Sequence, residues 1–123
     1  MAAEHLISIV DDDAAMREAL VGLVRSLGYD VRDFASAEDF LASNELGRFA
    51  CAITDIQMPG MNGFELKREL GMRHGSLPVI MITARAEPGM EEKAMSSGAA
   101  YFLRKPFEAG TLVSCLRRVL RGV

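Results

Sequence analysis

Short apolar runs alternate with amphipathic stretches along the whole chain. Each run is bounded by polar residues, glycine or proline, which is typical of β-strands, and the five runs occupy residues 6–10, 29–34, 50–54, 78–83 and 99–103. Three of them, at 6–10, 50–54 and 79–82, lack polar alternation. Continuous apolar character is typical of strands that are buried on both faces of a parallel sheet.

Helical spacing of apolar residues predicts a helix after each strand. The first carries its apolar positions between Met16 and Leu27 and ends at Gly28, because glycine commonly terminates helices. We expect Asp13 to begin or cap this helix. The second helix is expected to open at a Ser36 cap and to bury three apolar side chains, those of Ala37, Phe40 and Leu41.

Three further helices complete the pattern. The third is expected from about residue 64 to 72, with Leu66 and Leu70 facing inward, and the fourth, which is weakly apolar, from about 88 to 97. The fifth carries the apolar positions from Leu112 to Leu120. Five strands alternating with five helices imply an α/β fold with right-handed crossovers, in which helices cover both faces of a doubly wound parallel sheet.

Composition narrows the class of protein. The chain has 123 residues, which suits one domain spanning residues 1–123. Its net charge is −3, so the chain lacks the excess of basic residues that is typical of a nucleic-acid-binding surface. Apolar runs are too short to cross a bilayer, and MAAEHLISIV has no basic leader, so we expect neither a membrane span nor a secretory signal. Cys51 and Cys115 are expected to be buried, reduced thiols, which suits a cytoplasmic protein.

Polar side chains follow the strands at the edge where doubly wound sheets bind ligands. Three aspartates follow the first strand, Asp55 follows the third, Thr83 ends the fourth, and Lys105 follows the fifth. Each alone has an ordinary structural explanation: a helix or turn cap for an aspartate, a β-branched strand residue for the threonine, a solvated loop residue for the lysine. Together they place several carboxylates at one edge of the sheet. Their mutual repulsion lowers the stability of the fold unless a cation binds between them.

Phosphoryl transfer to a carboxylate uses this set of groups. Mg²⁺ prefers hard oxygen ligands, which Asp11 and Asp12 offer directly or through water, while Asp55 offers one oxygen and serves as the nucleophile. The metal ion and Lys105 neutralise the charge of the transferring group. Phosphorylation then adds negative charge, and the Thr83 hydroxyl is a suitable hydrogen-bond donor for it.

Four sequence blocks resemble the signatures of one signalling family. IVDDD, TDIQMPGMNGFEL, VIMITA and FLRKPF match, in order and spacing, the blocks of the response-regulator receiver family of two-component signalling, the CheY-like superfamily. The resemblance covers essentially the whole chain and is strongest to the FixJ-like branch, through SAEDFL and AMSSGAAYFLRKPF. It implies a flavodoxin-like (βα)5 fold with strand order 2-1-3-4-5.

The resemblance implies roles at the acidic site. Asp11 and Asp12 match the acidic pair that holds Mg²⁺, and Asp55 matches the phosphoacceptor, which becomes a 4-aspartylphosphate. Gln57 matches the position whose backbone carbonyl is a further metal ligand.

Residues of the later blocks match the parts that respond to phosphate. Thr83 matches the switch hydroxyl, Lys105 the phosphate-binding lysine, and Phe102 the aromatic switch position, although Phe102 also suits the core. The bond between Lys105 and Pro106 is cis in the family, and Arg85 lies where the family varies and tunes phosphate lifetime.

The function implied is that of a phosphoacceptor domain. It would take a phosphoryl group from a histidine kinase, transfer and slowly release it by its own residues without being an enzyme with turnover, and switch the surface formed by the fourth helix, fifth strand and fifth helix. That surface would control a partner, a phosphorylation-dependent homodimer or a DNA-binding output domain beyond the chain end, as expected for transcription regulation in the FixJ-like branch.

Three alternatives remain open at this point. A phosphatase of the haloacid-dehalogenase type also uses an aspartate nucleophile, and Asp11 and Asp13 imitate its motif, but Ala15 stands where Thr or Val is expected; turnover of a phosphate ester would reveal it. A flavodoxin-like FMN carrier needs a Ser/Thr-rich phosphate loop, which DDDAAM is not. A constitutive interaction module would have no use for the acidic, hydroxyl and lysine set.

Overall fold

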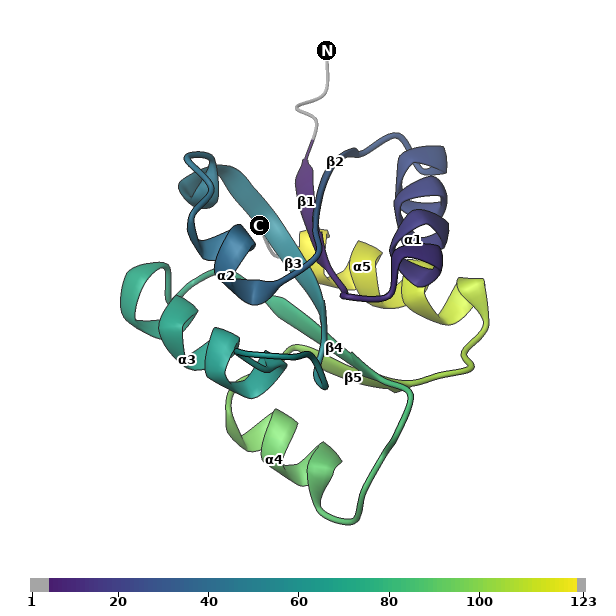
Figure 1. Cartoon of the computed structure of the whole chain (residues 1–123). Helices are drawn as coiled ribbons and strands as arrows, with labels where there is room; N and C mark the ends of the chain where they lie inside the picture. Colours follow the sequence, from purple (N-terminus) through teal and green to yellow (C-terminus); the bar gives the residue numbers. More distant parts are fainter. Residues whose placement is uncertain (1–4, 122–123) are drawn as a thin grey trace.

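A computed structural model of the chain describes residues 5–121. Its strands alternate with helices in the order expected from the apolar pattern (Figure 1). The strands are β1 (Leu6–Val10), β2 (Asp30–Phe34), β3 (Phe49–Asp55), β4 (Val79–Thr83) and β5 (Tyr101–Arg104). The helices are α1 (Ala14–Ser26), α2 (Ala37–Leu41), the 3-10 helix η1 (Leu46–Arg48), α3 (Gly63–Arg73), α4 (Met90–Ser96) and α5 (Ala109–Arg121).

All five strands are parallel and form one sheet in the order β2-β1-β3-β4-β5, which confirms the fold class and the strand order. Helices α1 and α5 cover one face of the sheet, and α2, α3 and α4 cover the other (Figure 1). Chain order reverses between β1 and β3, so the carboxyl ends of these two central strands meet at the switch point where such sheets bind ligands.

Two separate apolar clusters hold the helices to the sheet. On the α1 and α5 face, Ile53 of β3 packs with Leu20 and Leu116. On the other face, Phe40 of α2 and Leu66 of α3 are fully buried, and Phe40 makes an edge contact with Phe49 at a centroid distance of 5.3 Å. Because β1, β3 and β4 contribute to both clusters, their continuous apolar runs are explained.

Polar caps fix where three helices begin. The Asp13 side chain accepts hydrogen bonds from the backbone N–H groups of Ala15 and Met16, and the Ser36 hydroxyl accepts one from Asp39, so both expected caps are confirmed. Helix α3 has a capping box, in which Asn62 and Glu65 satisfy each other's backbone N–H groups. This box ties the first turn of α3 to the loop that follows β3.

Several details differ from the sequence expectations. Helix α4 begins only at Met90, because Gly89 before it has a φ of +82°, a left-handed conformation that ends helical geometry. Strand β3 extends to Asp55, so this residue completes the strand rather than following it. Leu41, expected to be buried, is half-buried at the end of the short helix α2.

The two cysteines are free and buried, as expected. Burial raises the pKa of the Cys51 thiol to about 12, so this thiol stays protonated and unreactive at neutral pH. Within residues 5–121, every helix is too short or too polar to span a bilayer.

Candidate functional site

Three carboxylates meet at the carboxyl ends of β1 and β3. One oxygen from each of Asp11, Asp12 and Asp55 lies within 4.8 Å of the others. Asp11 is 1% exposed and Asp55 9% exposed, whereas Asp12 is exposed to solvent. The sequence placed these residues at one edge of the sheet, and the structure brings them together.

Asp11 is held from three sides. Its Oδ1 accepts a hydrogen bond from the Asp13 backbone N–H at 2.9 Å, and its Oδ2 lies 3.3 Å from Lys105 Nζ. The Arg17 guanidinium of α1 donates to the Asp11 backbone carbonyl at 2.8 Å and pairs with Asp33 at 3.1 Å. Sequence reasoning missed Arg17, since an arginine in the second turn of a helix carries no distinguishing signal. Asp13, by contrast, is occupied by capping α1.

The Asp55 carboxyl has a high proton affinity. Burial, opposed by the positive charge of Lys105 and assisted by the negative charge of Asp11, raises the pKa of Asp55 to about 6. Its Oδ1 accepts a hydrogen bond from the Ile56 backbone N–H at 2.9 Å, which fixes the carboxyl plane. A carboxylate buried beside other carboxylates is stabilised by a cation, and its environment is that of a functional group rather than a surface residue.

A hydrogen-bonded chain connects the loops after β3 and β4. Thr83, fully buried, donates its hydroxyl proton to Gln57 Oε1 at 2.8 Å. The Gln57 Nε2 donates to the Arg85 backbone carbonyl at 3.0 Å, and the Arg85 backbone N–H donates to the Thr83 oxygen at 3.1 Å. Sequence reasoning assigned only the backbone of Gln57 to the site and missed this side-chain role.

The loop after Asp55 is fixed at two points. The Glu38 carboxylate of α2 accepts a hydrogen bond from the Met61 backbone N–H at 3.0 Å, and this bond lowers the pKa of Glu38. Gly60 adopts a φ of +74°, and a Cβ there would lie 2.6 Å from Glu38 Oε2. At Gly63 a Cβ would lie 2.8 Å from the Asp55 carbonyl oxygen, so a side chain there would collide with the backbone of β3.

Strand β5 carries Phe102 and is followed by Lys105. Phe102 is half-buried against the cluster on the α4 face, and its partner in register is Met81 of β4, two residues before Thr83. Side chains alternate along a strand, so Thr83 and Phe102 lie on the same face of the sheet. The Lys105-Pro106 bond is cis, as predicted.

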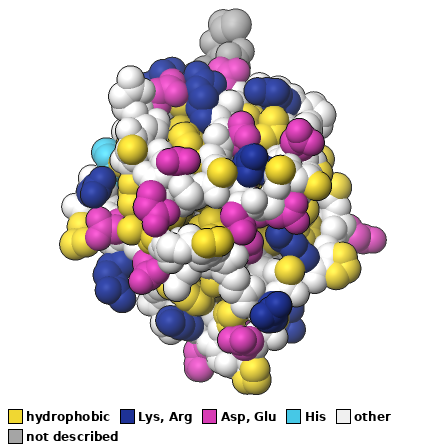
Figure 2. Space-filling view, in the orientation of Figure 1, with side chains coloured by type: hydrophobic (Ala, Val, Ile, Leu, Met, Phe, Trp, Pro, Cys, Tyr) yellow, Lys and Arg dark blue, Asp and Glu magenta, His cyan; other side chains and the backbone are white. Residues whose placement is uncertain are grey.

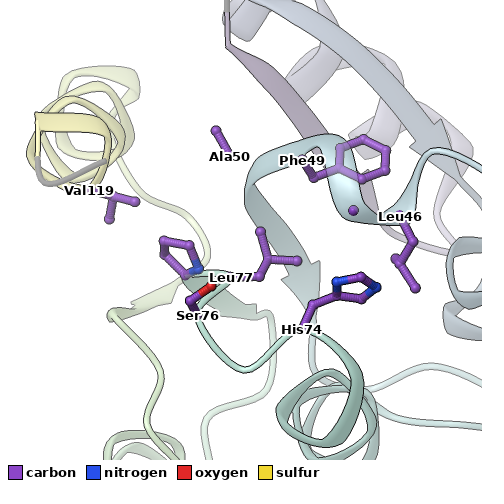
Figure 3. Close-up of a pocket in the computed structure, with 9 residues that line it drawn as sticks. Leu46, Phe49, Ala50, His74, Ser76, Leu77 and Val119 are labelled. Atoms are coloured by element: carbon purple, nitrogen blue, oxygen red, sulfur yellow. The ribbon is translucent and has the colours of Figure 1, made fainter.

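A separate hollow of about 350 Å³ lies at the opposite end of the sheet (Figure 3). The starts of β3 and β4 and the end of α5 enclose it, and Leu77, His74 and Val119 are among its lining residues. It contains none of the candidate site residues. On the face shown in Figure 2, acidic and basic side chains are interspersed.

The acidic cluster fits a divalent cation by its donor set. Carboxylate oxygens are the ligands that Mg²⁺ takes from proteins, usually one or two of them with waters completing the shell. Asp11, Asp12 and Asp55 supply the oxygens within 4.8 Å of one another, and the exposure of Asp12 leaves one side open to water.

Comparisons with known proteins agree with this geometry. Residues 7–117 match the family model of the response regulator receiver domain. The response regulator protein TmoT of Ectopseudomonas mendocina is 41% identical over 120 residues, which are 96% of this chain and 54% of that protein. The transcriptional regulatory protein FixJ of Bradyrhizobium diazoefficiens is 34% identical over 98% of this chain and 59% of its own length. The chain therefore spans about half the length of the curated relatives it matches.

Solved structures show the same fold. The crystal structure of FixJ-N superposes with a TM-score of 0.89 at 34% identity, covering 99% of this chain and 98% of that one. The Vibrio cholerae chemotaxis protein CheY4 superposes with a TM-score of 0.87 at 32% identity, covering 96% of this chain and all of that one. The chain belongs to the receiver domain family of two-component response regulators.

Proposed function

We propose that this domain accepts a phosphoryl group on Asp55 from a histidine kinase, in a reaction that requires Mg²⁺. The observation that carries the proposal is the buried Asp55 carboxyl at the end of β3, within 4.8 Å of the oxygens of Asp11 and Asp12. In the transfer, a nitrogen–phosphorus bond of the kinase phosphohistidine breaks and an oxygen–phosphorus bond to Asp55 forms.

Different residues would bind the metal ion, orient the acceptor carboxylate and supply positive charge during the transfer. Asp11, Asp12, Asp55 and the backbone carbonyl of Gln57 would hold Mg²⁺, which when bound neutralises phosphoryl oxygens. The Ile56 backbone N–H orients the Asp55 carboxylate through a 2.9 Å hydrogen bond. Lys105, which pairs with Asp11, lies close enough to lower the proton affinity of Asp55 and would supply a second positive charge to the phosphoryl group.

Phosphorylation would be transmitted through β4 and β5. The Thr83 hydroxyl would turn to donate a hydrogen bond to the phosphoryl group, and Phe102, on the same face of the sheet, would rotate inward into the space vacated. Helix α4 is a natural element to shift, because only Met90 and Ala94 of its seven residues are buried. The surface of α4, β5 and α5 would then bind a partner or form a homodimer.

The resulting activity is that of a phosphoacceptor switch in a cytoplasmic regulator, whose own residues catalyse the transfer from the donor and the slow release of phosphate, without enzymatic turnover. This chain matches 54% of the length of TmoT and 59% of that of FixJ, and FixJ is a transcriptional regulatory protein. A DNA-binding output domain in the whole protein would accordingly be the target of the switch, while the receiver domain itself makes no nucleic-acid contact.

Labelling of the acceptor tests the proposal. Acetyl phosphate or a phosphorylated histidine kinase, with Mg²⁺, should label wild-type protein on Asp55, located by borohydride reduction and peptide mapping. Asp55→Asn should abolish labelling, and chelation of Mg²⁺ should abolish it in the wild type. Labelling of Asp55→Asn at the wild-type rate would refute the assignment. Absence of steady turnover of a phosphate ester separates this function from that of a phosphatase.

A further inference from the structure

The Gln57 side chain bridges the loops that follow β3 and β4. It follows the acceptor strand β3 by two residues, and its carboxamide reaches across to the loop after β4. Its oxygen accepts the Thr83 hydroxyl proton at 2.8 Å, and its nitrogen donates to the Arg85 carbonyl at 3.0 Å. The two bonds connect Gln57 to residues 26 and 28 positions further along the chain.

The orientation of this carboxamide is fixed by its partners. The Arg85 backbone carbonyl is an acceptor only, so the group facing it has to be the amide nitrogen. The oxygen of the same amide then faces Thr83 and requires a donor. The Thr83 oxygen in turn accepts the Arg85 backbone N–H at 3.1 Å, so its own proton points to Gln57.

The Thr83 hydroxyl has a single proton, and two acceptors compete for it. In the structure described, Gln57 Oε1 holds that proton. A phosphoryl oxygen on Asp55 would need the same proton, because Thr83 has no other donor on its side chain. The buried position of Thr83 leaves no water to replace a lost partner cheaply, so one bond forms at the expense of the other.

We propose that the Gln57 carboxamide is a latch that stabilises the unphosphorylated state by holding the Thr83 hydroxyl and the Arg85 backbone. The latch rests on the proposed function, since it regulates the same phosphoacceptor site. Gln57 thus acts twice: its backbone carbonyl would serve the metal, and its side chain opposes the switch. It is a positioning residue, because it acts on the phosphoryl group only through Thr83.

Two substitutions remove the latch while keeping the backbone. Gln57→Leu keeps the approximate size without polar atoms, and Gln57→Asn keeps the carboxamide but shortens its reach by one methylene. In metal-free protein, both should accelerate hydrogen exchange of the Arg85 amide about tenfold, because the Thr83 oxygen loses its fixed orientation. With Mg²⁺, both should bind beryllofluoride, a phosphoryl mimic, about threefold to tenfold more tightly, the range that one net hydrogen bond contributes.

A double-mutant cycle separates a latch from a general change in the loop. In a Thr83→Ala background the hydroxyl is absent, so Gln57→Leu should change beryllofluoride affinity less than twofold. An equal gain in both backgrounds would overturn the proposal, and so would unchanged Arg85 exchange and unchanged affinity in the single variants. If wild-type protein fails to bind beryllofluoride, the proposed function fails, and the exchange measurement in metal-free protein still decides whether the latch exists.

Discussion

Lys105 Nζ lies 3.3 Å from Asp11 Oδ2, although the two residues are 94 positions apart in the chain. Both side chains are largely buried, at 17% and 2% exposure. The pair joins the end of β1 to the loop after β5 and leaves one ammonium group facing three carboxylates. Two negative charges therefore remain uncompensated among these four groups, a charge that one divalent cation would neutralise.

Removal of one carboxylate should separate metal binding from stability. Asp12→Asn should weaken Mg²⁺ binding about tenfold, equivalent to about 1.4 kcal/mol of lost attraction. The free energy of unfolding of the metal-free protein should rise or stay level, because repulsion is relieved. Calorimetric titration and thermal melts measure both quantities.

Asp13→Asn provides a matched control for this variant. It removes the same charge one residue further on, and asparagine caps helices as well as aspartate does. Its Mg²⁺ affinity should fall less than that of Asp12→Asn. Equal losses in the two variants would show that Asp12 acts only through the net charge of the region.

The raised pKa of Asp55 makes stability depend on pH. Folded protein holds this proton up to about pH 6, whereas the ordinary value is 3.8. The favourable contribution of the protonated form is therefore fully present below about pH 4 and is lost as pH rises through 6. Asp55→Asn should exceed the wild type in free energy of unfolding at pH 7.5, without metal, by about 1–2 kcal/mol.

This advantage should shrink towards pH 4, where the wild-type carboxyl is neutral in the folded protein and is beginning to be protonated in the unfolded chain. Urea denaturation in EDTA at pH 4.5, 6 and 7.5 measures it. A difference that stays constant over this range would mean that Asp55 does not titrate differently in the folded protein. Mg²⁺ affinity of the wild type should also fall below pH 6, since the metal competes with the proton.

Thr83→Ala should uncouple phosphorylation from its transmission. Asp55 should still be labelled, because the Thr83 hydroxyl holds no phosphoryl group before transfer. With beryllofluoride, NMR shift changes across residues 84–107 should fall to less than about half of those in the wild type. Without the Thr83 hydroxyl, binding of the mimic would no longer favour the active conformation over the inactive one. Large shift changes at α4 and Phe102 in the variant would show that a residue other than Thr83 couples the acceptor site to α4. Absence of these changes in the wild type would show that the acceptor site and α4 are not coupled.

Glu38→Gln should loosen the loop after β3. The Met61 backbone N–H would exchange its carboxylate acceptor for a weaker neutral one, so hydrogen exchange at Met61 should become several-fold faster. Asp39→Asn, one residue later and also exposed, is the control and should leave Met61 unchanged. Equal rates in wild type and Glu38→Gln would show that this contact does not hold the loop.

The sequence predicted those parts of the fold that depend on local patterns. Continuous apolar runs identified β1 and β4 to within a residue, because burial on both faces leaves no other composition for them. The Asp13 and Ser36 caps were predicted for the same local reason. The start of α4 was not predicted correctly, because the left-handed backbone of Gly89 interrupts the weak helical pattern there.

The candidate site was predictable only as a set of residue types at strand ends. Parallel strands bring their carboxyl ends together, so the proximity of Asp11, Asp12 and Asp55 follows from topology. The contacts of Arg17 and Gln57 depend on side-chain reach between segments that have no sequence relationship. Such contacts emerge only when three-dimensional positions are known.

Gly63 is needed for space rather than for backbone freedom, since its φ is not positive and yet a Cβ would approach the Asp55 carbonyl oxygen to 2.8 Å and the Ile56 Cα to 2.9 Å. Both obstacles are backbone atoms, which no rotamer change can move. In a saturation library at this codon, selection for a competent acceptor should return glycine alone. Alanine, tolerated at most helix starts, would have to displace the acceptor strand from the helix that follows it.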